Sequence, residues 1–171
     1  MVDGVVVERL RFEACNGYTT CMWHNLLTCK IVCDKHGRLQ NAKERFSVPY
    51  PEELRNNIIK RNTALLYSAM PAYSLQVKKA NGRNDRVSVV HRTAAFLESY
   101  FDVIFALNKQ THPGEKRLMA LCRNNCTILP EHFEENLNRL FDDMLIHSDN
   151  LTEDLNAIIL ELKSVMIRES L

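Results

Sequence analysis

The 171 residues are enough for one domain, or for one domain and part of another. A formal net charge of +1 gives no electrostatic reason to expect binding to nucleic acid or to an anionic membrane. No apolar run approaches the ~18 residues of a membrane span, and six cysteines without a signal peptide favour a reduced, cytoplasmic protein.

Residues 1–12 predict a β-strand, because β-branched residues such as Val5 and Val7 are enriched there. The rest of the chain offers no obvious partner strand, and a lone strand leaves its backbone groups unpaired. We therefore expect this strand to pair in a homodimer or with a domain missing from this sequence. A frayed, irregular leader is the alternative interpretation.

The next segments read as short helices. Residues 17–33 predict a helix with an extended end, and Asp34 to Gly37 predict a turn. A helix over 38–46 ends before Pro49, and Pro51 suits the start of another helix. Pro71 divides or kinks that helix, and a further helix covers 72–80.

Residues 85–109 predict the central helix, since two adjoining apolar stripes exceed what a surface helix needs. One stripe is Val90, Ala94, Leu97, Phe101, Ile104 and Phe105, and the other is Phe96, Tyr100, Val103 and Leu107. A polar strip remains, formed by Ser88, His91, Arg92, Ser99, Asp102, Asn108 and Lys109. Helices over 114–125, 131–147 and 152–170 complete a mainly α, antiparallel helical bundle with a short N-terminal strand segment.

The corner after the central helix is the strongest site candidate. The chain turns at His112, Pro113 and Gly114, and Lys116 and Arg117 stand where a new helix is expected to begin. Free backbone N–H groups and two cations at a helix start suit a phosphate. The alternative is a plain corner with two solvated cations.

Other chemistries are weaker. Cys29 and Cys33, like Cys122 and Cys126, are spaced one helical turn apart and could join a histidine in a zinc site. Buried free cysteines are the commoner outcome, so no metal site is expected. Phosphate loops, nucleophile elbows and HExxH motifs are missing from the sequence.

The string HRTAAFLESYFDVIFALNKQTHPGEKRL, with DKHGRL and VPYPEELRNNII upstream, resembles the helical C-terminal half of bacterial nucleotidyltransferase-like proteins. These are relatives of the kanamycin nucleotidyltransferases, in the polymerase-β-like superfamily. The resemblance covers residues 2–140 or so. It implies a division into residues 1–16, the remnant strand of an N-terminal nucleotidyltransferase module, and residues 17–171, the helical bundle domain.

The family's Gly-Ser and Asp-x-Asp motifs, which hold Mg²⁺ ions on a nucleoside triphosphate, are absent from this sequence. The stretch from Val2 to Glu8 resembles the later strand that carries a third carboxylate, so Glu8 falls at the expected catalytic position. Glutamate in place of aspartate lengthens that ligand by one methylene. The resemblance therefore implies that the two principal metal ligands lie upstream or were never present.

By the same resemblance, the helical half binds the nucleotide or the hydroxyl acceptor, a small molecule. The implied contributors are His91, Arg92, Asp102, Asn108, Lys116 and Arg117. Asp102 could orient Arg92, although a structural role for Asp102 and Asn108 is equally open. Two hypotheses remain: the substrate-binding domain of a nucleotidyltransferase, inactive alone, and a non-catalytic helical module that binds a ligand or partner or dimerises.

Overall fold

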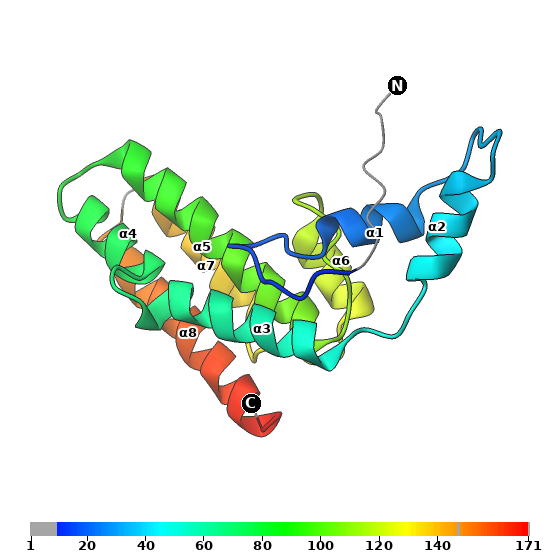
Figure 1. The fold of residues 1–171 in the computed structure, drawn as a ribbon. Coiled ribbons are helices and arrows are strands. Elements are labelled where there is room, and N and C mark those ends of the chain that lie inside the picture. The colour runs from blue at the N-terminus through cyan, green and yellow to red at the C-terminus, as the bar shows by residue number, and fades with distance from the viewer. Residues whose placement is uncertain (1–9, 147, 171) are drawn as a thin grey trace.

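The structure is a computed structural model, and it describes residues 10–146 and 148–170 (Figure 1). The elements in the described residues are helices: α1 Cys21–Thr28, α2 Arg38–Phe46, α3 Glu52–Thr63, the π-helix η1 Ala64–Ser68, α4 Tyr73–Asn81, α5 Arg86–Leu107, α6 Leu118–Asn125, α7 Phe133–Ile146 and α8 Leu151–Arg168. The predicted mainly α fold is confirmed. The expected strand lies almost entirely outside the described residues, and residues 10–12 of it are irregular.

Helix α5 is the centre of the bundle, as its two apolar stripes predicted. It packs against α3 and α4, α4 also packs against α8, and α7 packs against α8. Helices α3 and α4 both run antiparallel to α5 (Figure 1). Glu52 at the start of α3 forms an ion pair with Lys109 just after α5, and Asn62 near the end of α3 bonds to Asp102 within α5. Phe96, Tyr100 and Ile104 are fully or almost fully buried, so the hydrophobic effect holds α5 from several sides.

The N-terminal turns of α5 differ from the prediction. Val90 was expected in the core, but its side chain is 51% exposed, and Val87 is exposed as well. Val89 and Thr93 are buried instead. Along this part, α5 therefore buries a different face from the one that the stripe through Val90 predicted.

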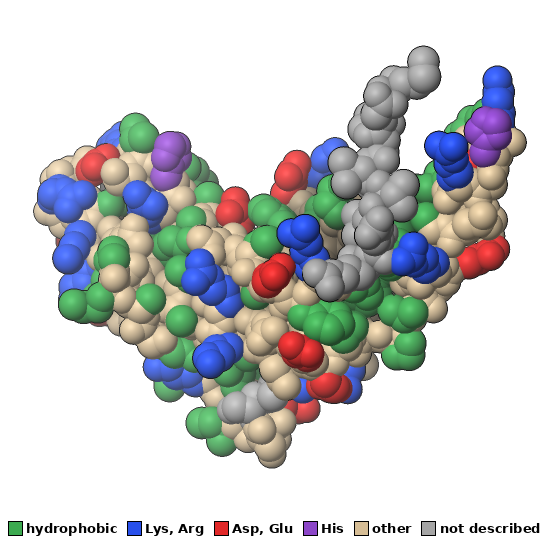
Figure 2. Space-filling model, viewed as in Figure 1, with side chains coloured by type: hydrophobic (Ala, Val, Ile, Leu, Met, Phe, Trp, Pro, Cys, Tyr) green, Lys and Arg blue, Asp and Glu red, His purple; other side chains and the backbone are tan. Residues whose placement is uncertain are grey.

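Helices α1 and α2 form an arm that projects from the bundle (Figures 1 and 2). The Trp23 indole Nε1 donates a 2.9 Å hydrogen bond to the Phe46 carbonyl, which ties the two helices together. Basic and acidic side chains both occur over the face shown in Figure 2, with basic ones at its left end and on the arm. Among the described residues, none of the helices has the length and apolar character that crossing a membrane requires.

Candidate functional site

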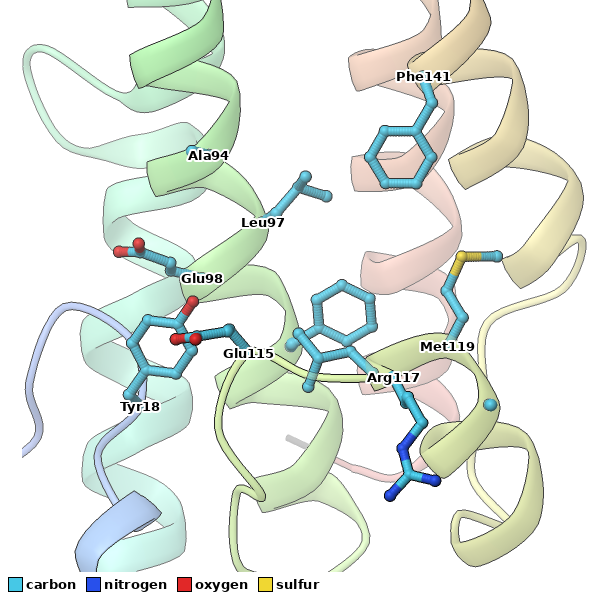
Figure 3. A pocket seen from close by; sticks show the side chains of 11 residues that line it. Tyr18, Ala94, Leu97, Glu98, Glu115, Arg117, Met119 and Phe141 are labelled. Atoms are coloured by element: carbon cyan, nitrogen blue, oxygen red, sulfur yellow. The ribbon is translucent and has the colours of Figure 1, made fainter.

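A cleft of about 540 Å³ opens where α5, α7 and the corner before α6 meet (Figure 3). Its lining combines large apolar side chains with three charged ones and a tyrosine. The lining residues are Tyr18, Ala94, Leu97, Glu98, Phe101, Glu115, Arg117, Leu118, Met119, Ala120 and Phe141. A concave, mainly apolar surface with a few polar groups is typical of a small-molecule site.

The apolar walls of the cleft come from different elements. Leu97 projects from α5 toward Phe141 of α7, and Met119 of α6 stands beside them (Figure 3). Helix α5 is anchored below the cleft because Phe101 packs edge-on against Phe133, with ring centroids 6.2 Å apart. The walls therefore stand on the bundle core and are held in place before any ligand arrives.

The polar end of the cleft is formed by Tyr18, Glu98 and Glu115, which lie close together in Figure 3. Burial raises the pKa of Glu98 above its ordinary value. Burial also raises the pKa of Tyr18, and the charges of Glu98 and Glu115 raise it further. Neither carboxylate has a hydrogen-bond or ion-pair partner among the described residues.

Tyr18 reaches the cleft because a buried polar cluster fixes the segment before α1. The Asp102 carboxylate of α5 accepts hydrogen bonds from the Thr19 backbone N–H at 3.2 Å and from the Thr19 hydroxyl at 2.6 Å. The Asn62 amide of α3 donates to Asp102 at 3.0 Å and accepts from the Gly17 N–H at 3.0 Å. The segment is thus bonded to both α3 and α5.

Asp102 therefore binds neighbouring protein groups, and Arg92 is not among its partners. Its side chain is 1% exposed, and burial raises its pKa from 3.8 to about 6 although three hydrogen bonds oppose the shift. The observed contacts position Tyr18, which in turn forms part of the cleft wall.

His112 forms the inner side of the corner and is completely buried. Its backbone N–H donates to the Thr20 hydroxyl at 2.7 Å, and its Nδ1 accepts the Gly114 N–H at 3.0 Å. The ring contacts Tyr18 edge-on, with centroids 4.9 Å apart. Burial, with a smaller contribution from His24, lowers the pKa of His112 to about 4, so the ring is neutral near pH 7.

The corner itself corrects one expectation. Helix α6 begins at Leu118, not near residue 114, because Gly114 and Arg117 both have positive φ angles, 92° and 57°. The Gly114 N–H, which a helix start would leave free for an anion, is bonded to His112. Lys116 and Arg117 are exposed on this corner, and Arg117 also lines the cleft.

Asn108 closes the C-terminal end of α5. Its side-chain oxygen accepts the backbone N–H groups of Thr127 at 2.9 Å and Ile128 at 2.8 Å. Its amide donates to the carbonyls of Ile104 and Ile128. Three of these bonds join the end of α5 to the loop after α6, and the bond to Ile104 lies within α5. Asn108 thus has the contacts that the capping alternative describes.

His91 and Arg92 lie apart from the cleft. Both are exposed on the first half of α5. His91 borders a separate, shallow depression with Arg86, Val87 and Val90. Since Asp102 is about three helical turns further along α5, the structure does not bring His91 and Arg92 together with it. Glu8 lies outside the described residues.

The cysteines fall into two kinds of environment. Cys122 and Cys126 are buried next to each other at the end of α6, and their mutual hydrogen bond raises the pKa of Cys122 and lowers that of Cys126. Cys29 is partly exposed and Cys33 is exposed. Across residues 10–146 and 148–170, no three histidine, cysteine, aspartate or glutamate side chains converge on a point that could hold a metal ion.

Sequence reasoning missed most of the cleft. Tyr18, Glu98 and Glu115 were not singled out, and Phe141 was not considered for a site. Glu98 offered one signal, because it is a carboxylate on an otherwise apolar face of the central helix, between Leu97 and Phe101. Tyr18 and Phe141 offered none, since they enter the site only through tertiary packing.

Residues 18–118 match a protein family described as a domain of unknown function, DUF4037. The match extends over more than half of the 171 residues, and the chain therefore belongs to this family. A search of curated proteins and a search of solved structures each returned no match. The family range includes Tyr18, Glu98, Glu115 and Arg117, but it ends before Phe141 of the opposite wall.

Proposed function

We propose that this chain is the substrate-binding helical domain of a nucleotidyltransferase-like protein, and that the cleft beside α5 takes the hydroxyl acceptor. The observation that carries the proposal is the position of the cleft. Its lining residues from Ala94 to Leu118 belong to the stretch over 91–118 that resembles nucleotidyltransferase-like proteins. The resemblance and the cleft are independent observations that point to the same part of the chain.

The charges around the cleft support two separate subsites. Glu98 and Glu115 stand at the end beside Tyr18 and would repel a polyphosphate placed there. Arg117 points away from this end in Figure 3, and its neighbour Lys116 is exposed. The nucleotide phosphates therefore contact Lys116 and Arg117, while the acceptor occupies the cleft.

In this proposal, Mg²⁺ and a nucleoside triphosphate supply the activated phosphoryl group. The described residues do not converge on a metal position, so they do not fit Mg²⁺ and no step is assigned to a metal here. What this chain contributes is the binding and orientation of the acceptor next to the nucleotide. Activity requires the Gly-Ser motif and the carboxylates of the Asp-x-Asp motif, neither of which occurs in these 171 residues.

A titration of the ¹⁵N-labelled chain with the Mg²⁺ complexes of ATP, GTP, CTP and UTP tests the proposal. We expect saturable amide shift changes at Lys116, Arg117 and Leu118 with at least one nucleotide. The double variant Lys116→Ala and Arg117→Ala is expected to weaken binding about tenfold, because two charge-assisted contacts are lost.

The matched control is the double variant Lys35→Ala and Arg38→Ala, which removes two exposed cations from the turn before α2 and the start of that helix. It is expected to leave nucleotide affinity unchanged. If no nucleotide perturbs the corner, or if both double variants weaken binding equally, the nucleotidyltransferase assignment is wrong.

A non-catalytic, ligand-binding helical module is the second candidate. The specific observation in its favour is that neither Gly-Ser nor Asp-x-Asp occurs in the 171 residues, while the cleft is fully formed by residues of the chain. Binding of a small molecule in the cleft without any nucleotide effect at Lys116 and Arg117 would favour this candidate.

A further inference from the structure

The acidic end and the apolar walls of the cleft together define a chemical class of ligand. We infer that the cleft binds an organic ammonium ion carried on an apolar chain or ring, with the cation held between Glu98, Glu115 and the Tyr18 ring. The inference deepens the proposed function, since the acceptor would be an ammonium compound of this kind that also carries the accepting hydroxyl group. The binding itself can be measured whether or not nucleotide transfer occurs.

The apolar walls of the cleft indicate that the part of the ligand beyond its charged group is apolar. Leu97, Phe101 and Leu118 offer no hydrogen bond to a hydroxyl group, and Phe141 and Met119 add further apolar surface. A polyhydroxylated body would lose water there without gaining partners, which is costly. An alkyl or aryl body would gain the hydrophobic free energy of burial instead.

The two glutamates without partners in the described part of the chain indicate that the ligand carries a positive charge. Glu98 is partly buried and Glu115 is exposed, and neither has a cationic or hydrogen-bonding partner among the described residues. Burial raises the pKa of Glu98, so its carboxylate is held in an environment that disfavours the negative charge. Burial also raises the pKa of Tyr18, and the charges of Glu98 and Glu115 raise it further. A bound ammonium would offset the cost of the desolvated Glu98 carboxylate.

Tyr18 supplies the third contact. Its ring is held by a T-shaped contact with the His112 ring, with centroids 4.9 Å apart. Tyr18 lines the same cleft as Glu98 and Glu115, and its pKa is raised in part by the charges of both (Figure 3). Ammonium ions bind both carboxylates and aromatic faces, so the three side chains suit one cation.

Arg117 does not fill this role. Among the described residues it is the single cationic side chain in the cleft lining, and Figure 3 shows its guanidinium pointing away from Glu98 and Glu115. No ion pair joins Arg117 to either acid within the described residues. The acidic end is therefore open to a cation from solution.

Calorimetric titration of the full 171-residue chain with hexylammonium chloride tests the inference. Hexanol is the neutral comparison, hexanoate the anionic one, and glucosamine hydrochloride carries the same cation on a polyhydroxylated body. We expect hexylammonium to bind at least about tenfold more tightly than the other three, because only it satisfies both the walls and the acids.

Glu98→Gln and Glu115→Gln are each expected to weaken hexylammonium binding about fivefold. Glu53→Gln is the matched control, since Glu53 is exposed on the first turn of α3 and outside the cleft lining. Should Glu98→Gln fail to fold, Glu115→Gln on the exposed corner still decides the question.

Absence of saturable hexylammonium binding, equal binding of hexanol, or unchanged affinity in the cleft variants would overturn the inference. Nucleotide binding at Lys116 and Arg117 is measured separately. Its survival in that case would leave the proposed function standing, while ammonium binding without nucleotide binding would leave this inference standing alone.

Discussion

Gly17 is the residue that brings the segment before α1 against the central helix. A Cβ atom on Gly17 would lie 2.7 Å from the Glu98 Cβ and 2.9 Å from the Glu98 backbone carbon, and the Gly17 φ angle is +89°. Only glycine combines this close approach with this backbone conformation. The position of Tyr18 in the cleft therefore depends on residue 17 being a glycine, which has no Cβ atom.

The first prediction concerns Gly17→Ala. The substitution is expected to lower the free energy of unfolding by about 3 kcal/mol, because overpacking adds to the strain of a positive φ. Gly37→Ala is the control, since Gly37 has φ +65° but no atom within 4 Å of its Cβ position. It should cost about 1 kcal/mol in urea denaturation. Equal costs for the two would show that Gly17 does not pack closely on α5.

Asp102 and Asn108 show how far sequence reasoning reaches at this scale. Both stand out in the sequence because they interrupt an apolar helix. Their contacts could not be predicted, since Asp102 binds Thr19 across 83 positions and Asn108 binds Ile128 across 20. Polar residues in a buried helix need hydrogen-bond partners, but the sequence pattern does not say whether the protein or a ligand supplies them.

At the scale of elements, periodicity predicted the helices well where one face is uniformly apolar. Helix α2 has the predicted bounds, and α5 begins and ends within two residues of them. The predicted start of α6 was wrong because Gly114 and Arg117 have positive φ angles, which a continuous α-helix excludes. The positive φ angle of Arg117 could not be predicted from the local pattern, since non-glycine residues seldom adopt one.

The second prediction concerns the start of α5. The Asp85 carboxylate accepts the Ser88 N–H at 3.1 Å and the Ser88 hydroxyl at 2.7 Å, so it caps the helix. Asp85→Ala is expected to lower the free energy of unfolding by about 1 kcal/mol. At the start of α8, Asn150 makes no such side-chain bond, and Asn150→Ala should cost less than about 0.5 kcal/mol. A reversed order in thermal unfolding would contradict the observed caps.

At the scale of the whole molecule, two buried groups act on stability in opposite directions. The raised pKa of Asp102, about 6 against 3.8, means that the folded state holds the proton more tightly, so its contribution to stability falls as pH rises from about 4 to 6. The lowered pKa of His112, about 4 against 6.5, means that its contribution rises over nearly the same range. The two contributions largely cancel in the natural protein.

The third prediction uses Asp102→Asn to separate these contributions. The variant has no carboxyl group at position 102, so it does not lose the stability that the natural protein loses there as pH rises. The free energy of unfolding of the variant minus that of the natural protein should therefore rise by about 3 kcal/mol between about pH 4 and pH 6.5. Thr19→Val keeps the carboxylate but removes one donor, and its difference from the natural protein should change far less. A difference for Asp102→Asn that is constant with pH would contradict the raised pKa.

The whole fold was easier to predict than the site. A mainly α bundle can be predicted from apolar periodicity alone, because the pattern of each helix lies within its own stretch of sequence. The cleft combines Tyr18, the corner after α5 and Phe141, and their meeting depends on how the helices pack. Sequence reasoning therefore found the corner and the central helix but missed the acids and the aromatic wall between them.

The most direct test of the account is the location of bound hexylammonium by intermolecular nuclear Overhauser effects on the methyl-labelled chain. If the cleft beside α5 is the substrate site, the ligand methylenes will show contacts to the methyl groups of Leu97, Leu118 and Met119. Contacts to Val87 and Val90 instead would place the ligand in the shallow depression on the first half of α5 and contradict the assignment.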